Sequence, residues 1–142
     1  MAVAAIDFGR KRIGLAITDT DGRGAYPVGI VERRSLKEDL DAIRSQLAER
    51  RVSRIVVGLP LNMDGAEGPS ARAARAFAEH LGTATGVAVE MFDERLTSVE
   101  AEERLRSASI SRSGKKAVRD AVAATEILEG WLESRRMQPN SR

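Results

Sequence analysis

The chain has no cysteine and a single histidine among its 142 residues. The lack of cysteine excludes disulfide bonds, thiolate catalysis and cysteine-ligated zinc, and it fits a reducing compartment such as the cytoplasm. The histidine, His80, falls within an expected helix, where a surface position is the simpler interpretation. The sequence therefore gives no support for a histidine-based metal site or for a Ser-His-Asp triad.

Aromatic residues and long apolar runs are also scarce. One Trp, one Tyr and three Phe leave no aromatic strip on which bases could stack, which argues against RRM-like and OB-like readers of single strands. No run approaches the roughly 18 apolar residues of a membrane helix, and no signal peptide is recognisable. We expect a cytoplasmic protein that makes no contact with a membrane.

Net charge is small, formally +2, which does not favour generic binding to long nucleic acid through counterion release. The positive charges are clustered, however, and local clusters can form a phosphate-binding surface on a nearly neutral protein. The alternative is that solvated faces and helix ends simply carry these charges. The clusters are Arg10-Lys11-Arg12, Arg50-Arg51 with Arg54, Arg112 with Lys115-Lys116 and Arg119, and Arg135-Arg136.

Length and composition predict one globular domain over residues 1–136, followed by a flexible tail at 137–142. Short apolar runs predict strands at 2–6, 13–17, 25–31, 53–59 and 87–92. Pro27 favours a position near the edge of the sheet for the third of these strands. Helical spacing and caps predict helices over about 35–50, 69–81, 97–106 and 116–136, and residues 82–86 are expected to end the second of them. Ser35 is the expected cap of the first helix, and Leu36 is the first residue of its apolar side. A hairpin meander followed by alternating helices and strands indicates an α/β domain with a mixed sheet flanked by helices.

Three carboxylates occupy positions that call for an explanation. Asp7 ends the apolar run of the first strand, Glu94 lies just past the end of the last strand, and Asp120 shares an apolar helix stripe. Burying an uncompensated carboxylate is costly. Each one alone has a structural alternative, which is pairing with a nearby cation or placement near a helix N-terminus.

Taken together, the three carboxylates suggest a metal site. Mg²⁺ and Mn²⁺ prefer hard oxygen ligands and take few protein carboxylates, with substrate phosphate completing the coordination shell. Two such ions about 3.5–4 Å apart can catalyse phosphodiester hydrolysis. The pattern therefore predicts a nuclease that uses Mg²⁺ or Mn²⁺, with two ions when substrate is bound.

Four motifs that contain these carboxylates resemble the YqgF family, also called RuvX, of Holliday-junction-resolvase-like proteins and pre-16S ribosomal RNA nucleases. The resemblance covers about residues 3–133 and implies an RNase H-like fold, a five-stranded mixed sheet with its first three strands antiparallel. The motifs are Asp7-Phe8-Gly9, Gly58-Leu59-Pro60-Leu61-Asn62 with Asp64-Gly65, Asp93-Glu94-Arg95-Leu96-Thr97-Ser98, and Asp120 followed by Ala123-Ala124 and Ile127-Leu128.

The resemblance implies that Asp7, Glu94 and Asp120 are the catalytic metal ligands, with Asp93 as the rival of Glu94 for the middle position. It also implies a basic rim around this acidic centre. The residues expected to bind nucleic acid are Arg10, Lys11, Asn62, Arg95, Lys115 and Lys116, of which Asn62 and Arg95 have an alternative role in folding their loops.

The resemblance implies a metal-dependent endonuclease that acts on structured nucleic acid. Processing of the 5′ end of pre-16S rRNA during ribosome biogenesis is preferred, with the ribosome as a further partner and a monomer or a homodimer as the assembly. Resolution of branched DNA is the alternative and would require a dimer with two active sites. A non-catalytic RNA- or ribosome-binding factor is a second alternative. An actin-like or sugar-kinase ATPase shares the first hairpin motif, but 142 residues leave no room for its second half.

Overall fold

The computed structural model describes residues 2–19, 24–97 and 115–136, and only the backbone of residues 115–120 and 136. Its described strands form one five-stranded sheet in the order β3-β2-β1-β4-β5. β1, β2 and β3 are antiparallel, whereas β4 and β5 run parallel to β1. This confirms the predicted mixed sheet. The strands are β1 Ala2–Phe8, β2 Arg12–Thr18, β3 Ala25–Glu32, β4 Val52–Leu59 and β5 Ala88–Asp93.

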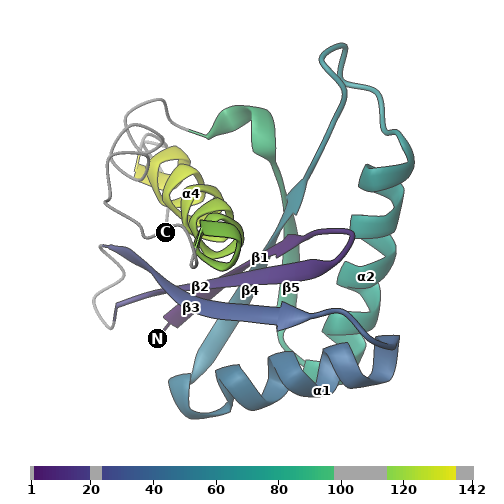
Figure 1. Cartoon of the computed structure of the whole chain (residues 1–142). Coiled ribbons are helices and arrows are strands. Elements are labelled where there is room, and N and C mark those ends of the chain that lie inside the picture. The colour runs from purple at the N-terminus through teal and green to yellow at the C-terminus, as the bar shows by residue number, and fades with distance from the viewer. Residues whose placement is uncertain (1, 20–23, 98–114, 137–142) are drawn as a thin grey trace.

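Helices cover both faces of the sheet, as Figure 1 shows: α1 and α2 lie on one face and α4 lies on the other. None of the described helices is long and apolar enough to cross a membrane. The helix expected over about 97–106 and the tail at 137–142 fall almost entirely on residues outside the described ranges. The described helices are α1 Leu36–Leu47, α2 Pro69–Thr85 and α4 Lys115–Arg136, with short 3₁₀ turns η1 Ala48–Arg50 and η2 Glu94–Leu96.

The sheet separates two hydrophobic layers. Alternate residues of a strand point to opposite faces, so Ala4 and Ile6 of β1 pack in the layer under α1 and α2, while Ala5 packs in the layer under α4. Asp7 continues this alternation on the α4 face. The first layer includes Ile13, Leu15, Ile55, Val57, Phe77 and Leu81, and the second includes Val56, Phe92, Ala124, Ile127, Leu128 and Trp131.

The end of α2 differs from the prediction, because residues 82–86 do not break the helix. α2 continues to Thr85 and stops at Gly86, whose left-handed backbone (φ 71°) directs its N–H to the Gly82 carbonyl. Gly82 stays helical, and a Cβ built on it would lie 3.5 Å from a Val89 methyl of β5, an ordinary van der Waals contact. Gly86 alone therefore provides the stop.

The start of α1 confirms the predicted Ser35 cap, whose side chain accepts the Glu38 N–H at 3.1 Å. Leu36, placed on the apolar side of this helix by its spacing, is instead 44% exposed. An acidic residue is buried here, because Asp39 is only 3% exposed and accepts the Arg34 N–H. The first turn of α1 is therefore fixed by polar contacts.

Strand β3 lies at one edge of the sheet, which confirms the position expected for Pro27. The pairing of β2 with β3 is irregular at this point. Leu15 faces Gly29 and the next residue, Ala16, faces Pro27, so Val28 is left as a bulge. The edge strand is thus both interrupted and bent.

Candidate active site

The carboxyl ends of β1, β4 and β5 lie at the same end of the sheet, because these three strands are parallel. Open α/β sheets bind ligands at this end, beyond the carboxyl ends of their strands. Asp7 is the last residue but one of β1, and Glu94 follows β5 immediately as the first residue of η2. The sheet thus brings together two carboxylates that are 87 positions apart in the sequence.

Glycines surround the two carboxylates. On β2, the residue paired with Asp7 is Gly14, which is buried. On β4, Gly58 follows Val57, the partner of Ile6. A Cβ built on Gly58 would lie 3.1 Å from the Glu94 carboxyl carbon. The absence of a side chain on Gly58 therefore lets the Glu94 carboxylate lie directly against β4.

Burial raises the pKa of the Glu94 carboxyl to about 7. The negative charges of Asp7, Asp93 and Glu126 contribute to this rise in the pKa of Glu94, after burial. The effect of Asp7 shows that the two predicted ligands are electrostatic neighbours. A half-buried carboxylate that is crowded by like charges is what a site for a cation would contain.

Asp93, the rival for the middle position, is engaged elsewhere. It caps η2 by accepting the Arg95 N–H at 2.9 Å, and it forms an ion pair with the Arg95 guanidinium at 2.8 Å. The hydrogen bond from this guanidinium holds the pKa of Asp93 below its ordinary value. Among the side chains that the structure describes, no arginine forms an ion pair of this kind with Glu94, which is the one of the two neighbours whose pKa the Asp7 charge raises.

Arg95 and Asn62 fold the loop after β4, residues 60–68, which we call the β4–α2 loop. The Arg95 guanidinium donates to the Met63 carbonyl at 3.3 Å, and the Asn62 backbone makes two hydrogen bonds across the loop, to Ala66 and Gly65. The side chain of Asn62 lies beside Gly68. Both residues thus have the structural role that was left open for them, and their contact with nucleic acid remains a prediction.

Arg33 was missed by the sequence analysis. Its guanidinium donates to the carbonyls of Gly9 and Arg10 at 3.1 and 3.2 Å and lies over the ring of Phe8, 4.4 Å from its centroid. It therefore holds the turn that follows Asp7 against the start of α1, where its Nε lies 3.8 Å from Asp39. Nothing in the local sequence pattern distinguishes this arginine from the other cations.

Replacing Asp39 by Ala should lower the free energy of unfolding by about 1–3 kcal/mol, because the Arg34 N–H would lose the hydrogen bond that the buried Asp39 carboxylate accepts. The matched control is Asp41→Ala on the same helix. Its carboxylate is 57% exposed and pairs with Arg44 at 3.8 Å, so the change should stay within about 0.5 kcal/mol. Urea denaturation of both variants measures the difference, and equal stabilities would contradict the assignment.

The third predicted carboxylate lies on α4, which crosses β1, β2 and β3. The first turns of this helix contain the backbone of Lys115, Lys116 and Asp120, and the structure does not describe the side chains of these three residues. Among the described side chains, no group of three or more His, Cys, Asp or Glu residues could hold a metal ion. The described part of the predicted site is therefore the pair Asp7 and Glu94.

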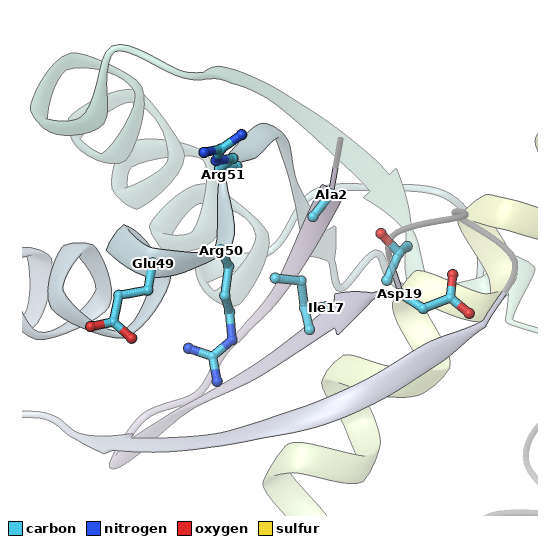
Figure 2. Close-up of a pocket in the computed structure, with 7 residues that line it drawn as sticks. Ala2, Ile17, Asp19, Glu49, Arg50 and Arg51 are labelled. Atoms are coloured by element: carbon cyan, nitrogen blue, oxygen red, sulfur yellow. The ribbon is translucent and has the colours of Figure 1, made fainter.

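A cavity of about 590 Å³ lies at the opposite end of the sheet, near the amino end of β1, as the labelled residues in Figure 2 show. Ala2 at the start of β1 lines it together with Ile17 near the end of the antiparallel β2. Its charged residues are of both signs, Asp19 and Glu49 with Arg50 and Arg51. This cavity is separate from the acidic pair, which lies at the other end of β1.

Comparison with known proteins identifies the family. The profile of the RuvX family, described as "Holliday junction resolvase", matches residues 1–134. A relative from Anaeromyxobacter sp. (strain Fw109-5) is 53% identical over 95% of this chain and 98% of its own, and one from Myxococcus xanthus is 46% identical over 96% and 90%. Both bear the name "Putative pre-16S rRNA nuclease".

Solved structures are similar at much lower identity. RuvC of Thermus thermophilus matches with a TM-score of 0.57 and 17% identity, covering 94% of this chain and 96% of that one. The fowlpox virus resolvase with Holliday junction DNA matches with a TM-score of 0.57 and 12% identity, covering 97% and 100%. These likenesses establish the RNase H-like fold. With a family match over residues 1–134 and relatives up to 53% identical, the chain belongs to the RuvX family.

Proposed function

We propose that this protein is a divalent-metal-dependent endonuclease that hydrolyses phosphodiester bonds of structured nucleic acid. The observation that carries the proposal is the Asp7–Glu94 pair at the carboxyl edge of the sheet, where burial and like charge raise the pKa of Glu94 to about 7. Two carboxylates are brought together at a cost that a bound cation would relieve. Membership of the RuvX family supports the same activity.

The donor set fits Mg²⁺ or Mn²⁺. Asp7 and Glu94 offer hard carboxylate oxygens, and Asp120 on α4 would complete the set, so that these three residues would hold the ions. When bound, a pair of such ions stabilises the charge of the reacting phosphate and activates the attacking water. The absence of cysteine and the single histidine leave no softer ligand set in the chain.

The protein's own residues shape the site around this centre. Gly58 leaves the space that the Glu94 carboxylate occupies, and Arg95 holds Asp93 and the β4–α2 loop. Arg10 and Lys11 are exposed in the turn directly after β1. Arg10 also lines a cavity of about 400 Å³ beside the first residues of α2. Together with Lys115 and Lys116, these cations would bind the phosphate backbone of the substrate.

The preferred substrate is the 5′ end of pre-16S rRNA, which places the protein in ribosome biogenesis in the cytoplasm with the ribosome as a further partner. The names of the relatives that are 46–53% identical support this choice. The family description supports the alternative, a resolvase acting on branched DNA, which would act as a homodimer. A monomer is sufficient for cleavage of RNA.

Cleavage should require Mg²⁺ or Mn²⁺, stop in EDTA, and fall by at least about 10²-fold in Asp7→Asn, because a ligand oxygen and its charge are lost. The experiment compares a 16S rRNA precursor fragment with a four-way DNA junction. The control variant is Asp41→Asn, whose exposed carboxylate on α1 should leave the rate unchanged.

Each outcome of this experiment has a definite meaning. Cleavage of RNA alone supports the processing nuclease, and cleavage of the junction alone moves the assignment to the resolvase. If both substrates were bound but neither was cut, the non-catalytic factor would replace the proposal. Activity that survives Asp7→Asn would show that the acidic pair is not the catalytic centre.

A further inference from the structure

The side chain of Met63 is 98% exposed, although methionine is an apolar residue. It lies in the β4–α2 loop, which projects beyond the sheet and helices in Figure 1. A second exposed apolar residue is Leu96 in η2, which is 60% exposed and lies two positions after Glu94. Two large apolar side chains are thus presented to solvent by the segments that follow β4 and β5.

The β4–α2 loop is held in one shape by a dense set of hydrogen bonds. The Asn62 N–H donates to the Ala66 carbonyl at 2.9 Å, and the Gly65 N–H donates to the Asn62 carbonyl at 2.8 Å. The Ala66 N–H also donates to the Asp64 carboxylate at 2.9 Å. Because these bonds close the loop on itself, Met63 is displayed on a built turn.

Arg95 connects this turn to the acidic pair. Its guanidinium donates to the Met63 carbonyl at 3.3 Å, and the same group is fixed by its ion pair with Asp93. Arg95 is the residue next to Glu94. The Arg95 side chain therefore connects the backbone of Met63 to the residue next to the predicted catalytic Glu94.

An exposed methionine on a fixed turn beside the proposed nuclease site is suited to contact with the bases of a nucleic acid. Apolar side chains such as Met and Leu enter between base pairs, partly unstack them and kink the duplex. The polarizable thioether of Met also packs well on aromatic rings, and every base offers such a face. The chain has few aromatic side chains that could serve instead, with one Trp, one Tyr and three Phe.

We propose that Met63, with Leu96 beside the site, acts as a wedge that enters the base stack next to the scissile phosphate. The wedge selects positions where a base leaves its stack easily, so that cleavage depends on local unstacking. This inference rests on the proposed nuclease function. It assigns to that site a specificity-determining residue that is not itself one of the predicted metal ligands.

The test uses Met63→Ala, with Met63→Leu as the conservative variant and Tyr26→Ala as the control. Tyr26 is 54% exposed on β3, and two strands, β2 and β1, lie between β3 and β4 in the sheet. Two RNA hairpins carry 2-aminopurine beside the cleavage site and differ in one feature: the base there is paired in one hairpin and unpaired in the other. Binding is measured in EDTA by fluorescence, and cleavage is measured in Mn²⁺.

We expect the wild type to raise the 2-aminopurine fluorescence of the paired hairpin on binding, and Met63→Ala to lose this rise. Met63→Ala should cut the paired hairpin about 10- to 100-fold more slowly, in line with the cost of unstacking one base step. It should cut the unpaired hairpin within about 3-fold of the wild type, because no unstacking is needed there. Met63→Leu and Tyr26→Ala should behave as the wild type.

Two results would overturn the wedge. The first is an unchanged fluorescence rise in Met63→Ala, and the second is an equal loss of cleavage on both hairpins, which would indicate a general binding contact. Failure of the proposed function can be told apart from failure of the wedge. If the wild type cuts neither hairpin nor any other substrate, the nuclease assignment is contradicted. The fluorescence measured in EDTA still tests the wedge in that case. An exposed Met63 that serves a protein partner would leave both readouts unchanged.

Discussion

Replacing Glu94 by Gln should abolish cleavage and at the same time stabilise the metal-free protein at alkaline pH. The loss of activity should be at least about 10²-fold, because the amide removes a charged ligand from the acidic pair. The gain in stability follows from the energetic cost of this carboxylate. Burial and the charges of its acidic neighbours raise its pKa from 4.5 to about 7, so its charged form is disfavoured in the folded state.

The pH dependence has a definite sign. The pKa of Glu94 is higher in the folded protein than in the unfolded chain, so its contribution to stability is fully present below about pH 4.5 and is lost as pH rises through about 7. Glu94→Gln has no such dependence. Its free energy of unfolding should therefore equal that of the wild type near pH 4.5 and exceed it by about 1–3 kcal/mol at pH 8, with screening of a half-buried group taken into account.

Urea denaturation in EDTA at pH 4.5, 6 and 8 measures this difference. Glu79→Gln is the control, because Glu79 is exposed on α2, and its stability should differ little from the wild type at all three values. Adding Mn²⁺ should stabilise the wild type more than Glu94→Gln. A stability difference that does not change between pH 4.5 and 8 would refute the idea that the protein bears a cost to keep this carboxylate in place.

Gly58→Ala should destabilise the protein by about 1–3 kcal/mol and reduce cleavage sharply. Backbone propensity alone predicts the opposite sign, because glycine within a strand costs roughly 0.5–1 kcal/mol relative to alanine. Packing decides the outcome. A Cβ on Gly58 would lie 2.5 Å from the Ile127 Cδ1 and 3.1 Å from the Glu94 carboxyl carbon, and Ile127 is only 1% exposed.

A second substitution separates the two contacts. In Gly58→Ala combined with Ile127→Val, the methyl group at 2.5 Å is removed, so much of the lost stability should return. The contact with Glu94 remains, so cleavage should stay low. Thermal denaturation and cleavage rates of the single and double variants form the cycle. If activity recovered together with stability, Gly58 would be a packing residue with no specific role at the site.

The fold was largely predictable because its signals are local. Alternating short apolar runs and charged turns defined all five strands, and Ser35 marked the start of α1 correctly. The end of α2 was predicted wrongly, because Gly82 and Gly86 look alike in the sequence. Only the structure distinguishes the glycine that stays helical from the one that takes a positive φ.

Two carboxylates of the candidate site could be picked out from the sequence, whereas the contacts around them could not. Carboxylates on strands attract attention because burial is costly, and the sheet does bring Asp7 and Glu94 together. The contacts of Arg33 and Met63 depend on tertiary structure, since Arg33 reaches back to Gly9 and Met63 is held by Arg95. No spacing rule connects residues that meet only after the loops have folded.

The irregular pairing of β3 affects how readily copies of the protein associate through the edge of their sheets. An open sheet edge is a template on which further strands can add, the first step of ordered aggregation. Here Pro27 has no amide hydrogen to offer, and the bulge at Val28 bends the strand away from a straight ladder. Two copies of the chain that meet are thereby hindered from joining their sheets through β3.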